Sequence, residues 1–232
     1  MSPVAQDLMN ACHSTARRPT GWAVLAVGLA LAGAASPAPA TVLIFEPTDR
    51  NFQRTDQAYG DRVVATAQDG FLYGADGGFT PNVMVAYGRL PGAFPSQWTF
   101  GYGDLQGILF DDEDSFGHLE IELAADAGWW VTLAHFDMAA YRPVAPINDV
   151  RVVNGAGDEL FRQDGVAVPD VGHISFDFDP PLQGRWLTIS FDASNLGGWS
   201  DDIGIDNVTF SQMELPTGVD AGSWTRTKAL YR

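Results

Sequence analysis

Two carboxylates near opposite ends of the chain, Glu46 and Asp206, have the chemistry of a metal site. Each lies in or directly after an apolar run, at residues 41–45 and 203–210 respectively. Calcium takes six to eight hard oxygen ligands in a flexible cage, and carboxylates and backbone carbonyls supply such ligands. If the first and last strands pair, these two carboxylates meet, with Asp202 as a further donor. We therefore expect a structural Ca²⁺ site here; the alternative is that these acids only solvate loop ends.

The pattern of the last apolar run predicts a local irregularity beside Asp206. Apolar residues fall on odd positions up to Ile205 and on even positions from Val208 onward. A strand has a side-chain period of two, so it cannot keep both sets in the core without an extra residue. We predict a β-bulge at Asp206 and Asn207, which re-aims the carboxylate and frees nearby backbone groups.

Three tryptophans, Trp98, Trp130 and Trp199, are candidate platforms for stacking against a sugar ring. Successive side chains of a strand point to opposite faces, so Trp129 and Trp130 cannot both enter one core. We expect Trp129 to face inward and Trp130 to lie on the other face. The alternative is that all of these rings cover the ends of the fold.

A hydrolytic site is the second candidate chemistry. His118, Glu120 and Glu122 project from one face of a predicted strand, and glycosidases use a pair of carboxylates as acid and nucleophile. The polar face of an ordinary antiparallel strand gives the same alternation. His135 and His173 are interpreted as packed or surface histidines.

Short alternating runs bounded by turn residues position these groups. Helical periodicity is nearly absent after residue 40, which predicts an all-β fold with two antiparallel sheets, a jelly-roll-like sandwich spanning residues 41–212. Residues 213–232 lack a strand pattern and are expected to form a loose tail. The predicted strands are 41–45, 62–67, 82–87, 107–110, 118–124, 130–136, 150–153, 159–163, 173–178, 186–191 and 203–210.

The first 40 residues have the features of a signal peptide. Two arginines, Arg17 and Arg18, precede a short apolar run, and the small residues that follow lead to Ala38-Pro39-Ala40. We therefore expect a secreted or cell-envelope protein with no membrane span after cleavage. The one cysteine, Cys12, would leave with the signal, so a mature domain without disulfides is expected.

The charge balance excludes several classes of partner. The formal charge of the chain is −16, and removal of residues 1–40 takes away two arginines and one aspartate, which makes it −17. Such a surface repels polyphosphates and anionic headgroups, so binding to nucleic acid or to a membrane surface is not expected. The hydrophobic fraction of 46% indicates a domain with a real core.

In their order along the chain, several short motifs resemble those of exported bacterial proteins of the PEP-CTERM type. The resemblance runs from about residue 41 to residue 212. The motifs are FE at 45–46, YGDRV at 59–63, GFTPN at 78–82, WTFGYGDL at 98–105, GWWVTL at 128–133, FD at 136–137, NLG at 195–197 and DIGIDNVTFS at 202–211.

The resemblance implies a jelly-roll domain similar to carbohydrate-binding modules, exported by a bacterium that makes extracellular polysaccharide. It also implies calcium ligation by a first-strand Glu and a last-strand Asp, here Glu46 and Asp206. Family members end in a Pro-Glu-Pro sorting signal, an apolar helix and a basic cluster, which this chain lacks after Gln212. Free release, or a truncated or frameshifted gene, is the expectation that follows.

Together these observations predict an exported, non-catalytic β-sandwich that binds or organises a polysaccharide or cell-surface glycan and is stabilised by Ca²⁺. A glycoside hydrolase using Glu120 and Glu122 is one alternative. A structural matrix or surface protein without glycan binding is the other.

Overall fold

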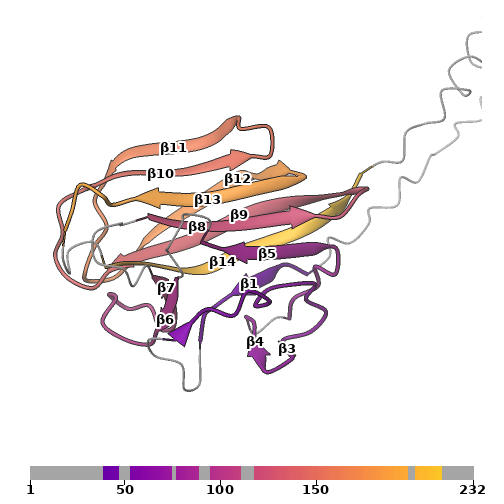
Figure 1. Ribbon diagram of the computed structural model, residues 1–232, viewed down its shortest axis with the longest axis horizontal. Helices are drawn as coiled ribbons and strands as arrows, with labels where there is room; N and C mark the ends of the chain where they lie inside the picture. The colour runs from indigo at the N-terminus through magenta and orange to yellow at the C-terminus, as the bar shows by residue number, and fades with distance from the viewer. Residues whose placement is uncertain are drawn as a thin grey trace, which may run out of the picture. The chain divides into compact units, whose positions relative to one another are not determined.

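The computed structural model describes residues 39–46, 53–74, 77–88, 95–110, 118–197 and 202–215, and the description below concerns these residues. Within them the chain is all-β, and two antiparallel sheets form a sandwich, as the sequence predicts (Figure 1). Hydrophobic residues of both sheets join one core, because strands such as β5 (Val83–Tyr87), β8 (His118–Ala125) and β13 (Trp186–Asp192) alternate inward buried and outward less buried side chains.

The first sheet has five strands in the order β11-β10-β13-β8-β5. Its inner face is apolar: Leu119, Ile121 and Leu123 of β8 are buried, and the intervening side chains point to the outer face. The strands are β5 (Val83–Tyr87), β8 (His118–Ala125), β10 (Ile147–Asn154), β11 (Glu159–Val166) and β13 (Trp186–Asp192).

The second sheet follows the order β12-β9-β14-β7-β6-β2, and β1 also pairs with β14. A small separate pair consists of β3 (Ala67–Gln68) and β4 (Phe71–Leu72). The strands of the second sheet are β1 (Thr41–Leu43), β2 (Gln53–Arg54), β6 (Ser96–Trp98), β7 (Ile108–Phe110), β9 (Trp129–Ala140), β12 (Ile174–Gly184) and β14 (Ile203–Glu214).

The first and last strands pair, as predicted. Thr41 lies opposite Phe210 and Leu43 opposite Val208 in the antiparallel register of β1 and β14. The predicted bulge is also confirmed, because the register of β14 against β9 shifts after Asp206 and Asn207 adopts a positive φ of 53°. The extra residue returns the later apolar side chains to the core.

The bulge lies where β14 changes partners along one edge. Gly204 and Ile205 pair with β7, whereas residues 208–210 pair with β1. The other edge of β14 pairs with β9 along most of its length. Asp206 therefore lies at the seam between β7 and β1, where the ladder on that side is interrupted.

Strand β12 differs from the prediction. The sequence predicts a strand that ends at residue 178, yet β12 continues through Pro180 and Pro181 to Gly184. Its register against β9 breaks between Asp177 and Leu182, and β12 is an edge strand, where a proline costs no ladder hydrogen bond. The irregular edge strand therefore accommodates both prolines.

The predicted signal peptide lies outside the described residues except for Pro39 and Ala40. At the other end, β14 reaches Glu214, two residues past the predicted limit of the sandwich. Residues 216–232 of the predicted tail lie outside the described part. In the part of the chain that the structure describes, a helix with the length and apolarity needed to cross a membrane is absent.

The seam yields a first prediction, for Gly107→Ala. Gly107 has a φ of 79°, and an added Cβ would lie 2.7 Å from the carbonyl oxygen of Phe45 and 2.8 Å from the nitrogen of Glu46. We expect thermal unfolding to show a larger loss of stability than for Gly128→Ala, where φ is 89° and nothing lies within 4 Å of the added atom. The control should lose roughly 1–2 kcal/mol from backbone strain alone. Equal losses would contradict the close packing at the seam.

Candidate functional site

Asp206 is a buried carboxylate with little compensation. Its Oδ1 accepts a hydrogen bond of 2.7 Å from the backbone N–H of Asn207, and this is the one hydrogen bond that its side chain receives from the described residues. Burial raises the pKa of Asp206 well above its usual value; the Asn207 N–H lowers it, and the nearby Asp137 and Glu46 carboxylates raise it further. An ionised Asp206 is therefore costly unless a cation is present.

The residues around Asp206 fit a hard cation in part. Glu46 is exposed and close enough to act on Asp206 electrostatically. Phe45, two residues after the end of β1, has a positive φ of 43°, so a left-handed residue lies on each side of the seam. Asp202 directly precedes β14, about 13 Å from Asp206 at the rise of an extended strand, and its carbonyl accepts the N–H of Tyr141. The structure thus brings Glu46 and Asp206 together but not Asp202.

Any metal at the seam must take further ligands from backbone carbonyls or water. In the part of the chain that the structure describes, there is no group of three or more His, Cys, Asp or Glu side chains that could hold a metal ion. Two carboxylates and the free backbone groups of a bulge suit Ca²⁺, which accepts carbonyl and water oxygens.

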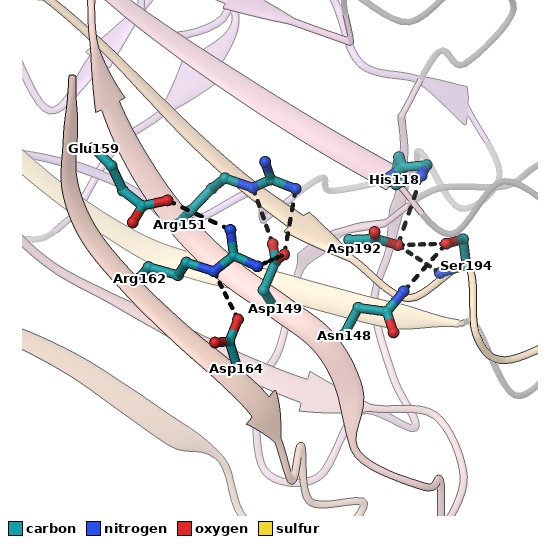
Figure 2. A network of polar contacts seen from close by, with 9 residues as sticks. All are labelled: His118, Asn148, Asp149, Arg151, Glu159, Arg162, Asp164, Asp192 and Ser194. Atoms are coloured by element: carbon teal, nitrogen blue, oxygen red, sulfur yellow. Dashed lines mark hydrogen bonds and ion pairs between the residues drawn. The ribbon is translucent and has the colours of Figure 1, made fainter. Parts of the chain in front are cut away.

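The outer face of the five-stranded sheet carries a network of charges (Figure 2). Asp149 is buried between two guanidinium groups: Arg151 Nε donates at 2.9 Å to Oδ1, and Arg162 Nη2 lies 3.1 Å from Oδ2. Arg162 also donates through Nε to Asp164 at 2.7 Å and lies 3.6 Å from Glu159. These side chains hold each other in defined positions, because Arg151 contacts Asp149 through Nε and Nη2 and Arg162 is shared among three carboxylates.

A second group in Figure 2 lies around Asp192, at the end of β13. Its Oδ1 accepts the Ser194 hydroxyl at 2.6 Å and the Ser194 N–H at 2.9 Å, and His118 Nε2 lies 3.6 Å away. Burial raises the pKa of Asp192, but these bonds and His118 outweigh it, so the pKa is lowered. Asp192 is thus held ionised at the edge of the same face.

The predicted hydrolytic residues occupy this outer face as well. His118, Glu120 and Glu122 alternate with the buried leucines and isoleucine of β8 and lie opposite Asp192, Ser190 and Thr188 of β13. Glu122 is only 6% exposed, whereas Glu120 is half-buried. The two carboxylates therefore share a face, but they differ in access to solvent.

An aromatic ring that the sequence analysis missed lies on the same face. Trp186 is 38% exposed and lies opposite Ala124, which lies opposite Met84 on its other side. Small Ala124 thus separates an exposed tryptophan from an exposed methionine. The alternation of Leu187 and Ile189 with polar residues was the signal that places Trp186 on the wet face.

The three predicted tryptophans have different positions. Trp98 is half-buried and packs against a satellite cluster on the outer face of the seven-stranded sheet. Trp130 is half-buried and lies opposite Met213, while Trp129 packs against the core, as the alternation predicts. Trp199 lies outside the described residues.

A chain of histidines and aspartates crosses the outer face of the seven-stranded sheet. Buried Asp137 lies at its centre, with His135 Nε2 at 3.2 Å and His173 Nε2 at 3.7 Å from Oδ1. The Nδ1 atoms of these histidines lie 2.8 Å from Asp177 and Asp104 respectively. Both histidines were interpreted as packed or surface residues; the fold brings them together at Asp137.

The central carboxylate of this chain is strongly stabilised in its ionised form. Burial alone would raise the pKa of Asp137, but hydrogen bonds from His135, Ser175 (2.6 Å) and Asn207 (2.9 Å) outweigh it and lower the pKa to about 2. The hydrogen bond to Asp137 is the largest cause that raises the pKa of His135. Asp104 has the same effect on the pKa of His173.

Comparisons with known proteins add little to this geometry. No family model matches the chain, and no curated protein matches it. A solved structure, the enzymatically active domain of tailspike protein 4 from bacteriophage CBA120, is similar over 57% of this chain, which spans 19% of that chain. The identity is 12% and the TM-score 0.30, a likeness that carries no argument about activity.

This comparison does correct one prediction. The chain was expected to be non-catalytic, yet a solved structure that it matches is an enzymatically active domain. We therefore withdraw the assignment of the protein as a non-enzyme. The likeness assigns no reaction to this chain in its place.

The histidine chain yields a prediction for His135→Gln. The stabilising effect of a raised histidine pKa is present below pH 6.5 and is lost as pH rises through the folded value. The stabilising effect of the lowered Asp137 pKa is present above pH 3.8 and is lost as pH falls toward 2. We expect the melting temperature to fall by roughly 2–8 °C, most strongly between about pH 4 and pH 6.5.

Asp177→Asn is the matched control, because Asp177 contacts the same histidine but is largely exposed. It should lower the melting temperature much less. A difference between wild type and His135→Gln that stays constant from pH 3 to pH 9 would contradict the role of ionisation.

Proposed function

We propose that the protein is an exported glycan-binding β-sandwich whose binding surface is the outer face of the five-stranded sheet. The observation that carries the proposal is the combination of an exposed aromatic ring, Trp186, with a fixed network of carboxylates and guanidinium groups on one face. Sugars present apolar C–H faces and hydroxyl groups together. Aromatic stacking suits the former, and charged hydrogen-bonding groups suit the latter.

The polar network favours binding because it is already ordered. Asp149, Arg151 and Arg162 position one another, so little side-chain entropy is lost when hydroxyl groups dock. Acids outnumber bases on this face, as on the whole chain with its charge of −16. Electrostatics therefore favours a neutral polysaccharide over a polyuronate or a sulfated polymer. The predicted signal peptide supports a role outside the cell.

Calcium binding at the seam is the second part of the proposal. Glu46 and Asp206 would hold the ion, with backbone carbonyls and water completing its ligands. The ion would offset the cost of an ionised, buried Asp206 and so tie β1 to β14. This is a structural role that supports the sandwich.

The binding face is tested by affinity electrophoresis in gels containing mixed-linkage β-glucan, galactomannan, dextran or polygalacturonate. We expect a neutral polymer to retard the wild type. Trp186→Ala should weaken the binding about tenfold, because the loss of stacking and apolar contact is on the order of 1.4 kcal/mol. Trp186→Phe should retain most of it.

Val64→Ala is the control for an exposed apolar residue outside both sheets and should bind as the wild type does. If no polymer retards the wild type, the glycan proposal is wrong and a matrix role without glycan binding is favoured. Release of reducing ends by the wild type but not by Glu120→Gln would assign this face to hydrolysis instead.

Calcium is tested by thermal unfolding of the wild type and Asp206→Asn with EDTA or Ca²⁺. In EDTA at neutral pH the variant should melt at a higher temperature. The raised pKa of buried Asp206 means that the wild-type folded state loses stability as pH rises above 3.8, and asparagine removes this cost. Saturating Ca²⁺ should raise the wild-type melting temperature by roughly 5–10 °C and leave the variant unchanged. Equal responses of both proteins to Ca²⁺ would exclude Asp206 as a ligand.

A further inference from the structure

The outer face of the seven-stranded sheet carries an aromatic patch, here defined as Trp98, Phe100 and Tyr141 with the residues beneath them. Phe100 is 58% exposed, and its ring lies 5.0 Å from that of Trp98 at an angle of 48°. Tyr141 contacts Tyr102 at 5.6 Å between ring centres. Buried residues of β7 and β9 lie beneath, so the rings cover one end of this sheet.

The loop that presents Phe100 is held in place by close packing. An added Cβ on Gly101 would lie 2.7 Å from the ring of Tyr141, and one on Gly103 would lie 1.8 Å from the carbonyl oxygen of Gly172. No side chain fits at either glycine, so the loop backbone lies directly against its neighbours. The aromatic patch is thus supported by the sheet and by the loop before β12.

The histidine chain fixes the same loop electrostatically. Asp104, four residues after Phe100, accepts from His173 at 2.8 Å, and His173 in turn faces buried Asp137 of β9. The loop that carries Phe100 thus also carries Asp104, which pairs with His173, and the guanidinium of Arg142 lies 5.6 Å from the Tyr141 ring centre. An exposed aromatic ring, flanked by half-buried rings, on a face with ion-paired groups is the same kind of chemistry as that of the five-stranded face.

We propose that this aromatic patch is a second saccharide-binding site, on the sheet opposite to the first. This rests on the proposed function of the five-stranded face. The two outer faces of a sandwich point away from each other, so both sites cannot bind one short glycan. A single chain would then bridge two polysaccharide strands and cross-link them, and multivalency would strengthen its attachment to a polymer network.

The experiment is titration calorimetry with short oligosaccharides from the neutral polysaccharide that retards the wild type, with light scattering of the intact polymer. The wild type should bind two oligosaccharides per chain and cluster the polymer. Phe100→Ala and Trp186→Ala should each bind one and cluster nothing, and the double variant should bind none. Phe100→Tyr should restore two sites, which separates loss of stacking from loss of folding.

The outcomes distinguish the two proposals. One site per wild-type chain, abolished by Trp186→Ala and unaffected by Phe100→Ala, would overturn the second site and leave the first. One site abolished by Phe100→Ala alone would overturn the proposed binding face and the bridging together. Unchanged melting curves for Phe100→Ala are the control that the loop remains folded.

Discussion

Strand β14 lies between β9 on one edge and β7 followed by β1 on the other, and this position organises the whole molecule. The last segment of the sandwich therefore closes the sheet against its first segment. Because the apolar residues of β14 change parity, the closure requires a bulge, and the bulge occurs where the partner strand changes. One packing requirement thus places Asp206 in a seam and aims Asn207 at Asp137.

Three buried aspartates differ in the groups that compensate for the burial of their carboxylates. Asp149 lies between two arginines, and Asp137 is bonded by a histidine, a serine and an asparagine. Asp206 has the backbone N–H of Asn207 and two like charges nearby, so its pKa rises whereas that of Asp137 falls. The contrast singles out Asp206 as the carboxylate that a cation would stabilise most.

The two outer faces share a design although their sequences are unrelated. Each has an exposed aromatic ring on the same face as ionised groups that are fixed by their own ion pairs, with Trp186 on one face and Phe100 on the other. The two rings are supported differently. Trp186 lies on a strand, whereas Phe100 lies on a loop whose glycines allow close packing against neighbouring residues and whose Asp104 is hydrogen-bonded to His173. Such order lowers the entropic cost of binding.

The sequence by itself determined the all-β class, the inward and outward faces of β8 and β13, the bulge at Asp206 and the opposite orientations of Trp129 and Trp130. Each follows from the two-residue period, which is local. The tertiary structure alone decided which residues of neighbouring strands and loops meet on one face. It brought His135, Asp137 and His173 together, and it placed β12 at a sheet edge, where the strand continues past its prolines. It also brought Glu46 close to Asp206, because strand rise sets distance along a strand while pairing between strands is set by the whole fold.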